Sequence, residues 1–135
     1  MKIEGKRIVV TGAASGIGRA LAHAFNNNGA SNVVCADLNF EEAQNTADSF
    51  KGLAIKCNVG DENEIQSLVE ESTDWMGGID IFCSNAGIMG EVGLLETSTE
   101  KWQSIWEINV MAHVYAAKAV LPQMLERGEG YLMNT

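Results

Sequence analysis

The sequence contains no long uninterrupted hydrophobic run and only one proline among its 135 residues. Its apolar runs are much shorter than the roughly 18 residues that a membrane-spanning helix needs, and a single proline excludes a proline-rich linker. Residues 1–7 are too polar for a secretory signal. With 46% hydrophobic and 20% charged residues, the composition is typical of a folded globular protein and not of a disordered one. We therefore expect one domain, residues 1–135, in the cytoplasm.

Basic residues are also scarce. The sequence has nine Lys and Arg and 18 Asp and Glu, which give a net charge of −9. Such a charge repels nucleic acid phosphates and anionic membranes, so we expect neither as a partner. An acidic surface can equally serve solubility alone.

Cysteine is infrequent and is not arranged for metal binding or for disulfides. The three cysteines, Cys35, Cys57 and Cys83, are odd in number and widely spaced, and each lies within or at the end of an apolar run. This placement indicates buried thiols in a reducing compartment. Only His23 and His113 accompany them, without the spacing of metal ligands, so no metal site is expected.

Short apolar runs alternate with amphipathic helical patterns along the chain. Runs typical of buried parallel strands occupy residues 8–10, 33–36, 53–55, 79–83 and 131–133. Helical patterns occupy residues 16–28, 40–50, a segment after Asp61, and 99–126, where Pro122 is expected to kink or shorten the helix. The alternation predicts an α/β protein of right-handed βαβ units around a parallel sheet, which is a Rossmann-type fold.

Three of the expected helices begin with residues that favour capping. Asn39 is expected to cap the second helix. Asp61 with Glu64, and Thr97 with Glu100, have the spacing of capping boxes at the starts of the third and fourth helices.

The strongest functional motif is the glycine-rich turn Thr11–Gly18, between the first strand and the first helix. Gly12 would allow the tight turn, Gly16 would let the backbone approach a pyrophosphate, and Gly18 would let the helix pack on the strand. The N–H groups at the start of the helix, with its positive dipole end, would then face the phosphates. Glycine turns often have only a structural role, but this position between strand and helix favours a dinucleotide site.

Asp37 supplies the second element of such a site, at the end of the second strand and 19 residues beyond Gly18. A carboxylate there can accept hydrogen bonds from the hydroxyls of the adenosine ribose, although it could instead serve only to cap the next helix. The same charge would repel a 2′-phosphate. No Arg or Lys compensates for it at the four flanking positions, Ala14, Ser15, Leu38 and Asn39. NAD(H) is therefore predicted in preference to NADP(H).

Together these residues resemble the short-chain dehydrogenase/reductase family. The family pattern Thr-Gly-x-x-x-Gly-x-Gly is matched in full by Thr11–Gly18. The family's Asp-Val pair after the third strand corresponds to Asn58-Val59, and its Asn-Asn-Ala-Gly after the fourth strand corresponds to Ser84–Gly87. Its helix-borne active-site Asn corresponds to Asn109. The resemblance covers the whole chain and implies a sheet of about five strands, ordered 3-2-1-4-5 with helices on both faces, that ends after strand five.

The resemblance also implies a set of site residues. Twelve of them are expected to bind the cofactor: Gly12, Ser15, Gly16, Ile17, Gly18, Asp37, Leu38, Asn58, Val59, Asn85, Ala86 and Gly87. Asn109 is the one remaining candidate for a catalytic residue.

Two departures from the family pattern are mild. Asn58 replaces the usual Asp, but its side-chain oxygen can still accept a hydrogen bond from the adenine amino group. Ser84 replaces the first Asn, which puts some hydrogen bonds that support the loop in doubt.

The third departure concerns catalysis. The family places a catalytic Ser just after strand five and a Tyr-x-x-x-Lys pair on the next helix, whereas this sequence ends at Thr135. Tyr115 and Lys118 are three residues apart and lie on the helix of Asn109, on faces turned away from it, so we interpret both as scaffold or surface residues. Two hypotheses remain. One is an NAD(H)-binding module that is not catalytic alone, which the end at Thr135 favours, and the other is the N-terminal half of an oxidoreductase acting on an alcohol or ketone.

The chain is also expected to form a homodimer or a higher homo-oligomer. In the resembled family the long helix after strand four pairs across subunits. Here that helix would leave Trp106, Val110, Val114 and Val120 partly uncovered, and strand five would present an apolar open edge.

Overall fold

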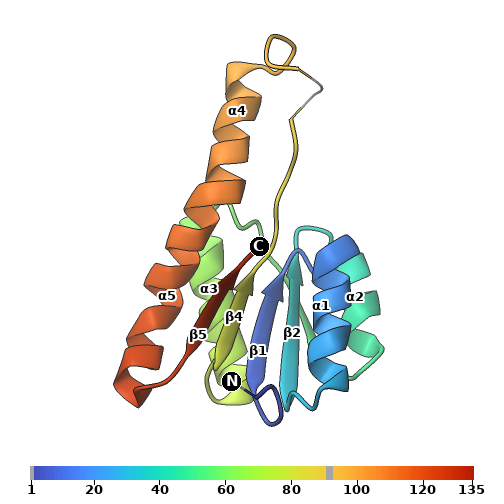
Figure 1. The fold of residues 1–135 in the computed structure, drawn as a ribbon, viewed down its shortest axis with the longest axis vertical. Coiled ribbons are helices and arrows are strands. Elements are labelled where there is room, and N and C mark those ends of the chain that lie inside the picture. The colour runs from blue at the N-terminus through green and yellow to red at the C-terminus, as the bar shows by residue number, and fades with distance from the viewer. Residues whose placement is uncertain (1, 91–92) are drawn as a thin grey trace.

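Parallel strands form one sheet in the order β3-β2-β1-β4-β5 in the computed structural model, which describes residues 2–90 and 93–135 (Figure 1). The strands are β1 (Arg7–Thr11), β2 (Asn32–Asp37), β3 (Leu53–Lys56), β4 (Ile81–Ser84) and β5 (Tyr131–Asn134). The central strand β1 pairs with β2 and β4, so that Val9 lies opposite Val34 on one side and Phe82 on the other. The strand order and the parallel pairing confirm the predicted Rossmann-type fold.

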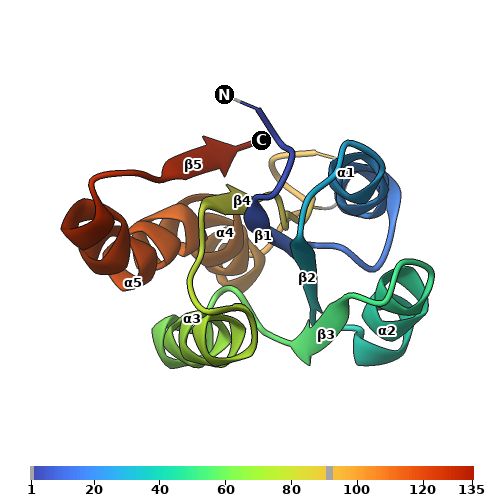
Figure 2. The same cartoon turned by 90° about the horizontal axis from the view of Figure 1, so that it is seen from below.

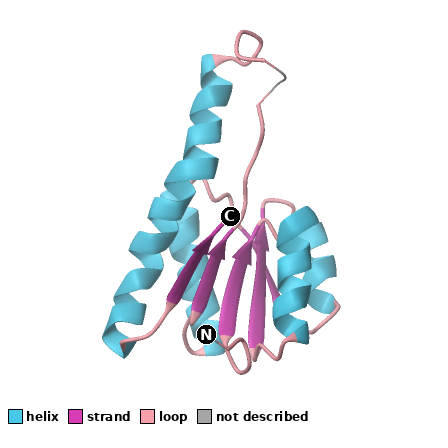
Figure 3. Cartoon of the chain, viewed as in Figure 1, coloured by secondary structure: helices cyan, strands magenta, loops and turns pink. Residues whose placement is uncertain are grey.

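Helices follow the strands and cover both faces of the sheet (Figures 2 and 3). They are α1 (Gly16–Asn27), α2 (Phe40–Asp48), α3 (Glu62–Met76), α4 (Thr99–Trp106), the short π-helix η1 (Glu107–Met111) and α5 (Ala112–Arg127). Helices α1 and α2 pack on one face, and α3 and α5 pack on the other. Helix α4 extends beyond the carboxyl edge of the sheet (Figure 1). Within the described residues, no helix is both long and apolar enough to cross a membrane.

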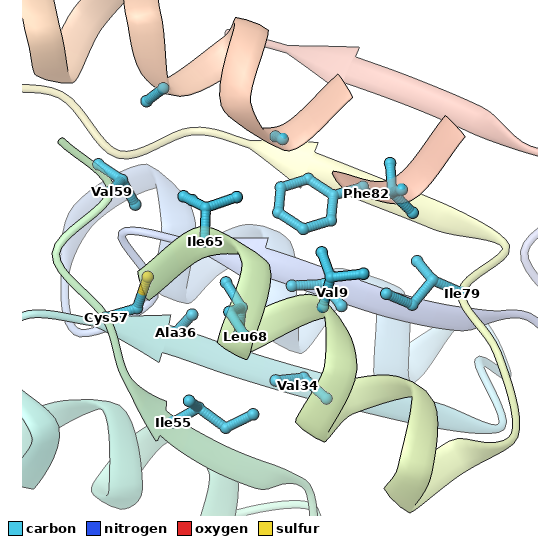
Figure 4. Close-up of a cluster of buried hydrophobic side chains, with 14 of the residues drawn as sticks. Val9, Val34, Ala36, Ile55, Cys57, Val59, Ile65, Leu68, Ile79 and Phe82 are labelled. Carbon is cyan, nitrogen blue, oxygen red and sulfur yellow. The ribbon is translucent and has the colours of Figure 1, made fainter. Parts of the chain in front are cut away.

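The inner strands β1, β2 and β4 are buried on both faces, which explains why they are continuous apolar runs, whereas β5 is exposed or half-buried. Successive residues of a strand point to opposite faces. Val9 accordingly joins the cluster beneath α3 and α5, with Leu68 and Phe82 (Figure 4), whereas Ile8 and Val10 join the cluster beneath α1 and α2.

The last helical segment differs from the expected single helix over 99–126. The chain stays helical from Thr99 to Arg127, close to the predicted extent, and of the two effects expected of Pro122 the shortening is wrong, because α5 continues past it. The irregularity lies earlier, in η1, where a π-turn inserts one extra residue into the helix.

The helix caps are partly as predicted. Asn39 accepts a hydrogen bond from the backbone N–H of Glu42, and Asp61 accepts from that of Glu64, as expected. The fourth helix is capped by Ser98, so the prediction of Thr97 as its cap is wrong. Ser98 has the extended backbone of a cap residue, and the Thr97 hydroxyl donates to the carbonyl of Gly93 instead.

One residue expected on the exposed face of the last helix is buried. Val120, on the sheet-facing side of α5, is 0% exposed, whereas Trp106, Val110 and Val114 are 54%, 38% and 43% exposed. At 100° per residue, Val120 lies about 120° around the helix from Val114 and therefore faces the sheet.

Burial sets the acidity of the three thiols. The cysteines of β2, the β3 end and β4 are buried and unpaired, as predicted. Removal from water raises the pKa of Cys35 and Cys57 to about 12 and that of Cys83 to about 11. The thiols are therefore protonated packing groups at neutral pH.

Candidate cofactor-binding cleft

An open cleft of about 440 Å³ lies at the carboxyl ends of β1, β2, β3 and β4. The structure brings all twelve residues predicted to bind the cofactor into its lining: Gly12, Ser15, Gly16, Ile17, Gly18, Asp37, Leu38, Asn58, Val59, Asn85, Ala86 and Gly87. The carboxyl edge of a parallel sheet, where the strand order reverses, is the place at which such folds bind ligands.

The glycines of the turn each meet a different requirement. Gly12 has φ +70°, and a Cβ there would lie 2.9 Å from the Cα of Ala86. A Cβ on Gly18 would lie 2.0 Å from the carbonyl oxygen of Gly12, so the close contact that this glycine allows is between α1 and the turn that follows β1. Gly16 has φ +51°, and a Cβ there would meet no atom within 4 Å, so its surroundings are open. The turn therefore packs tightly on its inner side and leaves room beside Gly16.

The N-terminus of α1 is prepared for an anion. Its cap residue, Ser15, makes no side-chain capping bond, and the first turn holds no acidic residue. Helices α2, α3 and α4 each have a side-chain cap and an acidic residue in the first turn. The first N–H groups of an α-helix have no partner within the helix. In α1 the residues of this turn, Gly16–Gly18, line the cleft, and the side chain of Ser15 does not cap them, so their N–H groups can donate to a phosphate.

Asp37 is oriented by the backbone on both sides. Its Oδ2 accepts from the N–H of Ala14 at 3.0 Å, and its Oδ1 accepts from the N–H of Asn39 at 2.9 Å. Each carboxylate oxygen keeps a second acceptor position, which can serve a diol. Among the described residues that line the cleft, Asp37 alone carries a charge.

The two sides of the cleft are joined through Thr11. Its hydroxyl oxygen accepts from the N–H groups of Asn85 at 2.9 Å and Ala86 at 3.1 Å. The side-chain amide of Asn85 donates back to the carbonyl oxygen of Thr11 at 3.0 Å. These bonds hold the bend after β4 against the glycine-rich turn.

Asn109 lies in η1 and does not line the cleft itself. Its Oδ1 accepts from the N–H of Ile88 at 2.9 Å, and its Nδ2 donates to the carbonyl oxygen of Ile88 at 2.8 Å. Both polar atoms of the side chain are thus bonded to the segment that follows Gly87. Asn109 therefore holds Ile88, which lines the cleft, through two hydrogen bonds.

Asn58 and Ser84, the two residues that depart mildly from the family pattern, each have a hydrogen-bond partner in the structure. The Asn58 side-chain oxygen accepts from the N–H of Gly60 at 3.1 Å and keeps one lone pair for another donor. The hydroxyl of Ser84 lies 2.8 Å from Nδ1 of His113, on α5. The carboxyl end of β4 is therefore tied to α5 by this pair.

Tyr115 and Lys118 are engaged away from the cleft. The Tyr115 hydroxyl donates to Oε2 of Glu107 at 2.9 Å, and this hydrogen bond raises the pKa of Tyr115 above its ordinary value. The ammonium of Lys118 donates to Glu62 on α3. A tyrosine with a raised pKa is the opposite of a general base prepared for neutral pH. Their interpretation as scaffold and surface residues agrees with these contacts.

Four further residues line the cleft that the sequence patterns did not indicate: Cys57, Ile88, Ile108 and Thr135. The first three are apolar neighbours of predicted residues, and adjacency to Asn58, Gly87 and Asn109 was the signal that could have found them. Within the part of the chain that the structure describes, no three His, Cys, Asp or Glu side chains are grouped so as to hold a metal ion.

Comparison with known proteins identifies the family of the chain. Residues 6–135 match the family model described as short chain dehydrogenase. The chain is 38% identical over 143 residues to a 1-deoxy-11-beta-hydroxypentalenate dehydrogenase of Streptomyces exfoliatus, which covers 100% of this chain and 52% of that protein.

Solved structures share the fold closely. A short chain dehydrogenase/reductase from Burkholderia phymatum, in complex with NAD, superposes with a TM-score of 0.93 at 26% identity and covers 99% of this chain and 50% of that one. A structure named as ribose-5-phosphate isomerase from Brucella melitensis 16M gives 0.91 at 28% identity, with 98% and 52% covered. The chain thus spans about half the length of the proteins it matches. Because the two structures carry different names, the fold alone does not give the reaction.

Proposed function

Since the chain belongs to the short chain dehydrogenase family, we propose that residues 1–135 form one dinucleotide-binding domain that holds NAD(H) in the cleft described above. The observation that carries the proposal is the convergence of two complementary groups on one cleft. The uncapped N-terminus of α1 offers N–H donors for a pyrophosphate, and Asp37 offers oriented acceptors for a ribose.

Each part of the cofactor has a matching part of the cleft. The open surroundings of Gly16 suit a pyrophosphate that approaches the backbone. The remaining lone pair of Asn58 suits the adenine amino group, and the bend held by Thr11 suits the nicotinamide end. When bound, NADH supplies a hydride, and the chain's own residues bind and orient the cofactor.

We propose NAD(H) in preference to NADP(H) because Asp37, the one charged side chain among the described residues that line the cleft, is negative. Asp37 would accept charge-assisted hydrogen bonds from the ribose hydroxyls and would repel a 2′-phosphate.

The reaction proposed for the whole protein is hydride transfer between NAD(H) and an alcohol or ketone. That reaction needs an acid beside the carbonyl oxygen. Asn109 cannot supply one, because an amide carries no acidic proton and both of its polar atoms are bonded to Ile88. We therefore propose that a polypeptide of these 135 residues binds the cofactor without turnover. Sequencing the gene beyond the Thr135 codon distinguishes the two hypotheses, because a continuing frame with Ser and Tyr-x-x-x-Lys would give the catalytic residues of a dehydrogenase.

Calorimetric titration with NADH and NADPH tests the cofactor assignment. NADH should bind more tightly, and Asp37→Ala should weaken NADH by about tenfold or more, the effect of losing a charge-assisted hydrogen bond. Asp48→Ala is the matched control, because Asp48 is exposed and does not line the cleft. Equal affinity for both cofactors, or unchanged NADH affinity in Asp37→Ala, contradicts the proposal.

The absence of turnover is tested separately by following NADH absorbance with a panel of ketones and aldehydes at high protein concentration. Oxidation of NADH that scales with protein and survives repurification would show that this polypeptide holds an acid which we have not identified.

We also propose that the chain self-associates through α4, α5 and the open edge of β5. Trp102 and Trp106 are 45% and 54% exposed, and Tyr131 of β5 is 50% exposed. Exposed apolar surface of this kind favours a two-fold contact between identical copies. Light scattering behind a sizing column tests it, and a mass of 14.5 kDa at micromolar concentration would contradict it.

A further inference from the structure

The side chain of Arg19 lies beside the glycine-rich turn, one residue after Gly18 in α1. Its Nη2 donates to the carbonyl oxygen of Ala14 and to Oε2 of Glu42, the latter at 2.7 Å. The N–H of the same Ala14 donates to Oδ2 of Asp37 at 3.0 Å. The guanidinium of Arg19 and the carboxylate of Asp37 therefore contact the two backbone polar groups of a single residue.

The ion pair between Arg19 and Glu42 is accessible and incompletely satisfied. The two side chains are 40% and 47% exposed, so a ligand can approach them. The Nε of Arg19 is buried and has no hydrogen-bond partner. The charge of the guanidinium is therefore neutralised by Glu42, and its buried Nε is not a donor that a ligand can reach.

We propose that Glu42 is a specificity-determining residue for the dinucleotide, because it keeps Arg19 from pairing with a 2′-phosphate on the adenosine ribose. The inference rests on the proposed NAD(H) function, in which Asp37 binds that ribose. With Glu42 present, the three side chains sum to a charge of −1 and repel a phosphate monoester that carries about −1.5 to −2 at neutral pH.

Removing either carboxylate brings the net charge of the group to zero, so it is the pairing of Arg19, and not the charge sum, that separates their contributions. Removing the charge of Glu42 releases Arg19 from its ion pair and leaves its hydrogen bond to the Ala14 carbonyl, whereas removing that of Asp37 leaves Arg19 paired with Glu42. Discrimination against NADP(H) therefore has a direct part at Asp37 and an indirect part at Glu42. Substitution of Asp37 alone should weaken NADH without giving tight NADPH binding.

The test compares NADH and NADPH affinities of the whole chain by calorimetry. Glu42→Gln should raise NADPH affinity about two- to fivefold, the effect of one partly exposed ion pair, and leave NADH within twofold. The backbone contacts of Glu42 with Asn39 and Thr46 remain in this variant, so it should fold. Adding Glu42→Gln to Asp37→Asn should give a further gain of the same size over Asp37→Asn alone.

Two controls separate pairing from general charge. Glu41→Gln removes the same charge from the same helical turn, but from an exposed side chain that is not in the ion pair with Arg19. It should leave the ratio of NADPH to NADH affinity unchanged. The double variant Arg19→Gln with Glu42→Gln should lose the gain in NADPH affinity that Glu42→Gln gives alone. An equal effect of Glu41→Gln, or a gain that persists without Arg19, overturns the inference. If Glu42→Gln binds NADH but its ratio of NADPH to NADH affinity is unchanged, the inference alone is overturned. If the unmodified chain does not bind NADH, the proposed function is overturned and the inference with it.

Discussion

Asp80→Asn should strongly destabilise the fold, because Asp80 joins β1 to β4 through a buried ion pair. The carboxylate is 7% exposed. Its Oδ2 accepts from the backbone N–H and the Nε of Arg7, both at 2.9 Å, and its Oδ1 accepts from Nη2 of Arg7 at 2.6 Å. Arg127, at the end of α5, lies 3.8 Å away. The contacts therefore tie together the amino ends of two central strands and the last helix.

The magnitude follows from the chemistry of the substitution. Asparagine keeps the shape of the side chain but removes the charge and turns an NH2 group toward the donors of Arg7. Breaking a buried pair by removing one charge costs about 3–5 kcal/mol, and because the Arg7 side chain is 25% exposed we expect the lower end, about 3 kcal/mol. For a chain of this length that loss corresponds to a fall in Tm of roughly 10 °C. Urea denaturation at pH 7 measures it, with Asp74→Asn on the exposed face of α3 as a control expected within about 0.5 kcal/mol of the unmodified chain.

The acid limb of the stability curve gives a second readout. Hydrogen bonds from Arg7 hold the pKa of Asp80 below its ordinary value in the folded chain. The stabilisation is therefore fully present above the pKa of the unfolded chain, about 3.9, and is lost as the pH falls through the lower folded pKa. The unmodified chain should lose more stability below about pH 4 than Asp80→Asn does. If the variant is within 0.5 kcal/mol at pH 7 and its acid limb runs parallel, this account of the ion pair is refuted.

Three further substitutions or treatments have defined outcomes. Gly18→Ala places a Cβ 2.0 Å from the carbonyl oxygen of Gly12, so it should cost about 1–3 kcal/mol in urea denaturation, and an unchanged midpoint would contradict the close contact. Asn109→Ala leaves the N–H and C=O of Ile88 without their partners and should cost about 1–3 kcal/mol, and NADH affinity should fall with it in the same titration used above. The three thiols should react with a disulfide reagent at pH 8 only as fast as the chain opens, because burial raises each thiol pKa to about 11 or 12, and one thiol that reacts at once would show an accessible thiolate.

Much of the fold could be predicted because a sheet buried on both faces requires apolar runs. Residues 8–10 and 33–36 were recognisable for that reason, whereas polar strand ends such as Lys56 and Asn134 pair only through their backbone and were not. The π-turn could not be predicted, since residues 107–111 have ordinary helical composition. There Asn109 bonds to Ile88, from a distant part of the sequence. At Thr97 and Ser98 two good cap formers are adjacent, and backbone geometry decides between them.

The residues of the site also fall into those that the sequence could predict and those that it could not. Glycines and Asp37 were predictable because a turn, a close approach or a ribose needs those residue types. Cys57 and Ile108 gained a place in the cleft lining only through the packing of the end of β3 and of η1. Likewise, pairing of Arg19 with Glu42 depends on how α1 and α2 are set side by side, and neither residue belongs to the motif that identified the site.

Thr11 has a consequence for the motion of the cleft. Its hydroxyl and carbonyl together carry the bonds to Asn85 and Ala86, so loosening of the glycine-rich turn must also release the bend after β4. We expect the backbone amides of these two segments to exchange with deuterium as one cooperative unit, at a common rate. A ligand that orders only one end of the cleft would then reduce the conformational entropy left to lose at the other end. Half of a dinucleotide, such as AMP, should in this way slow amide exchange in the bend that it does not touch.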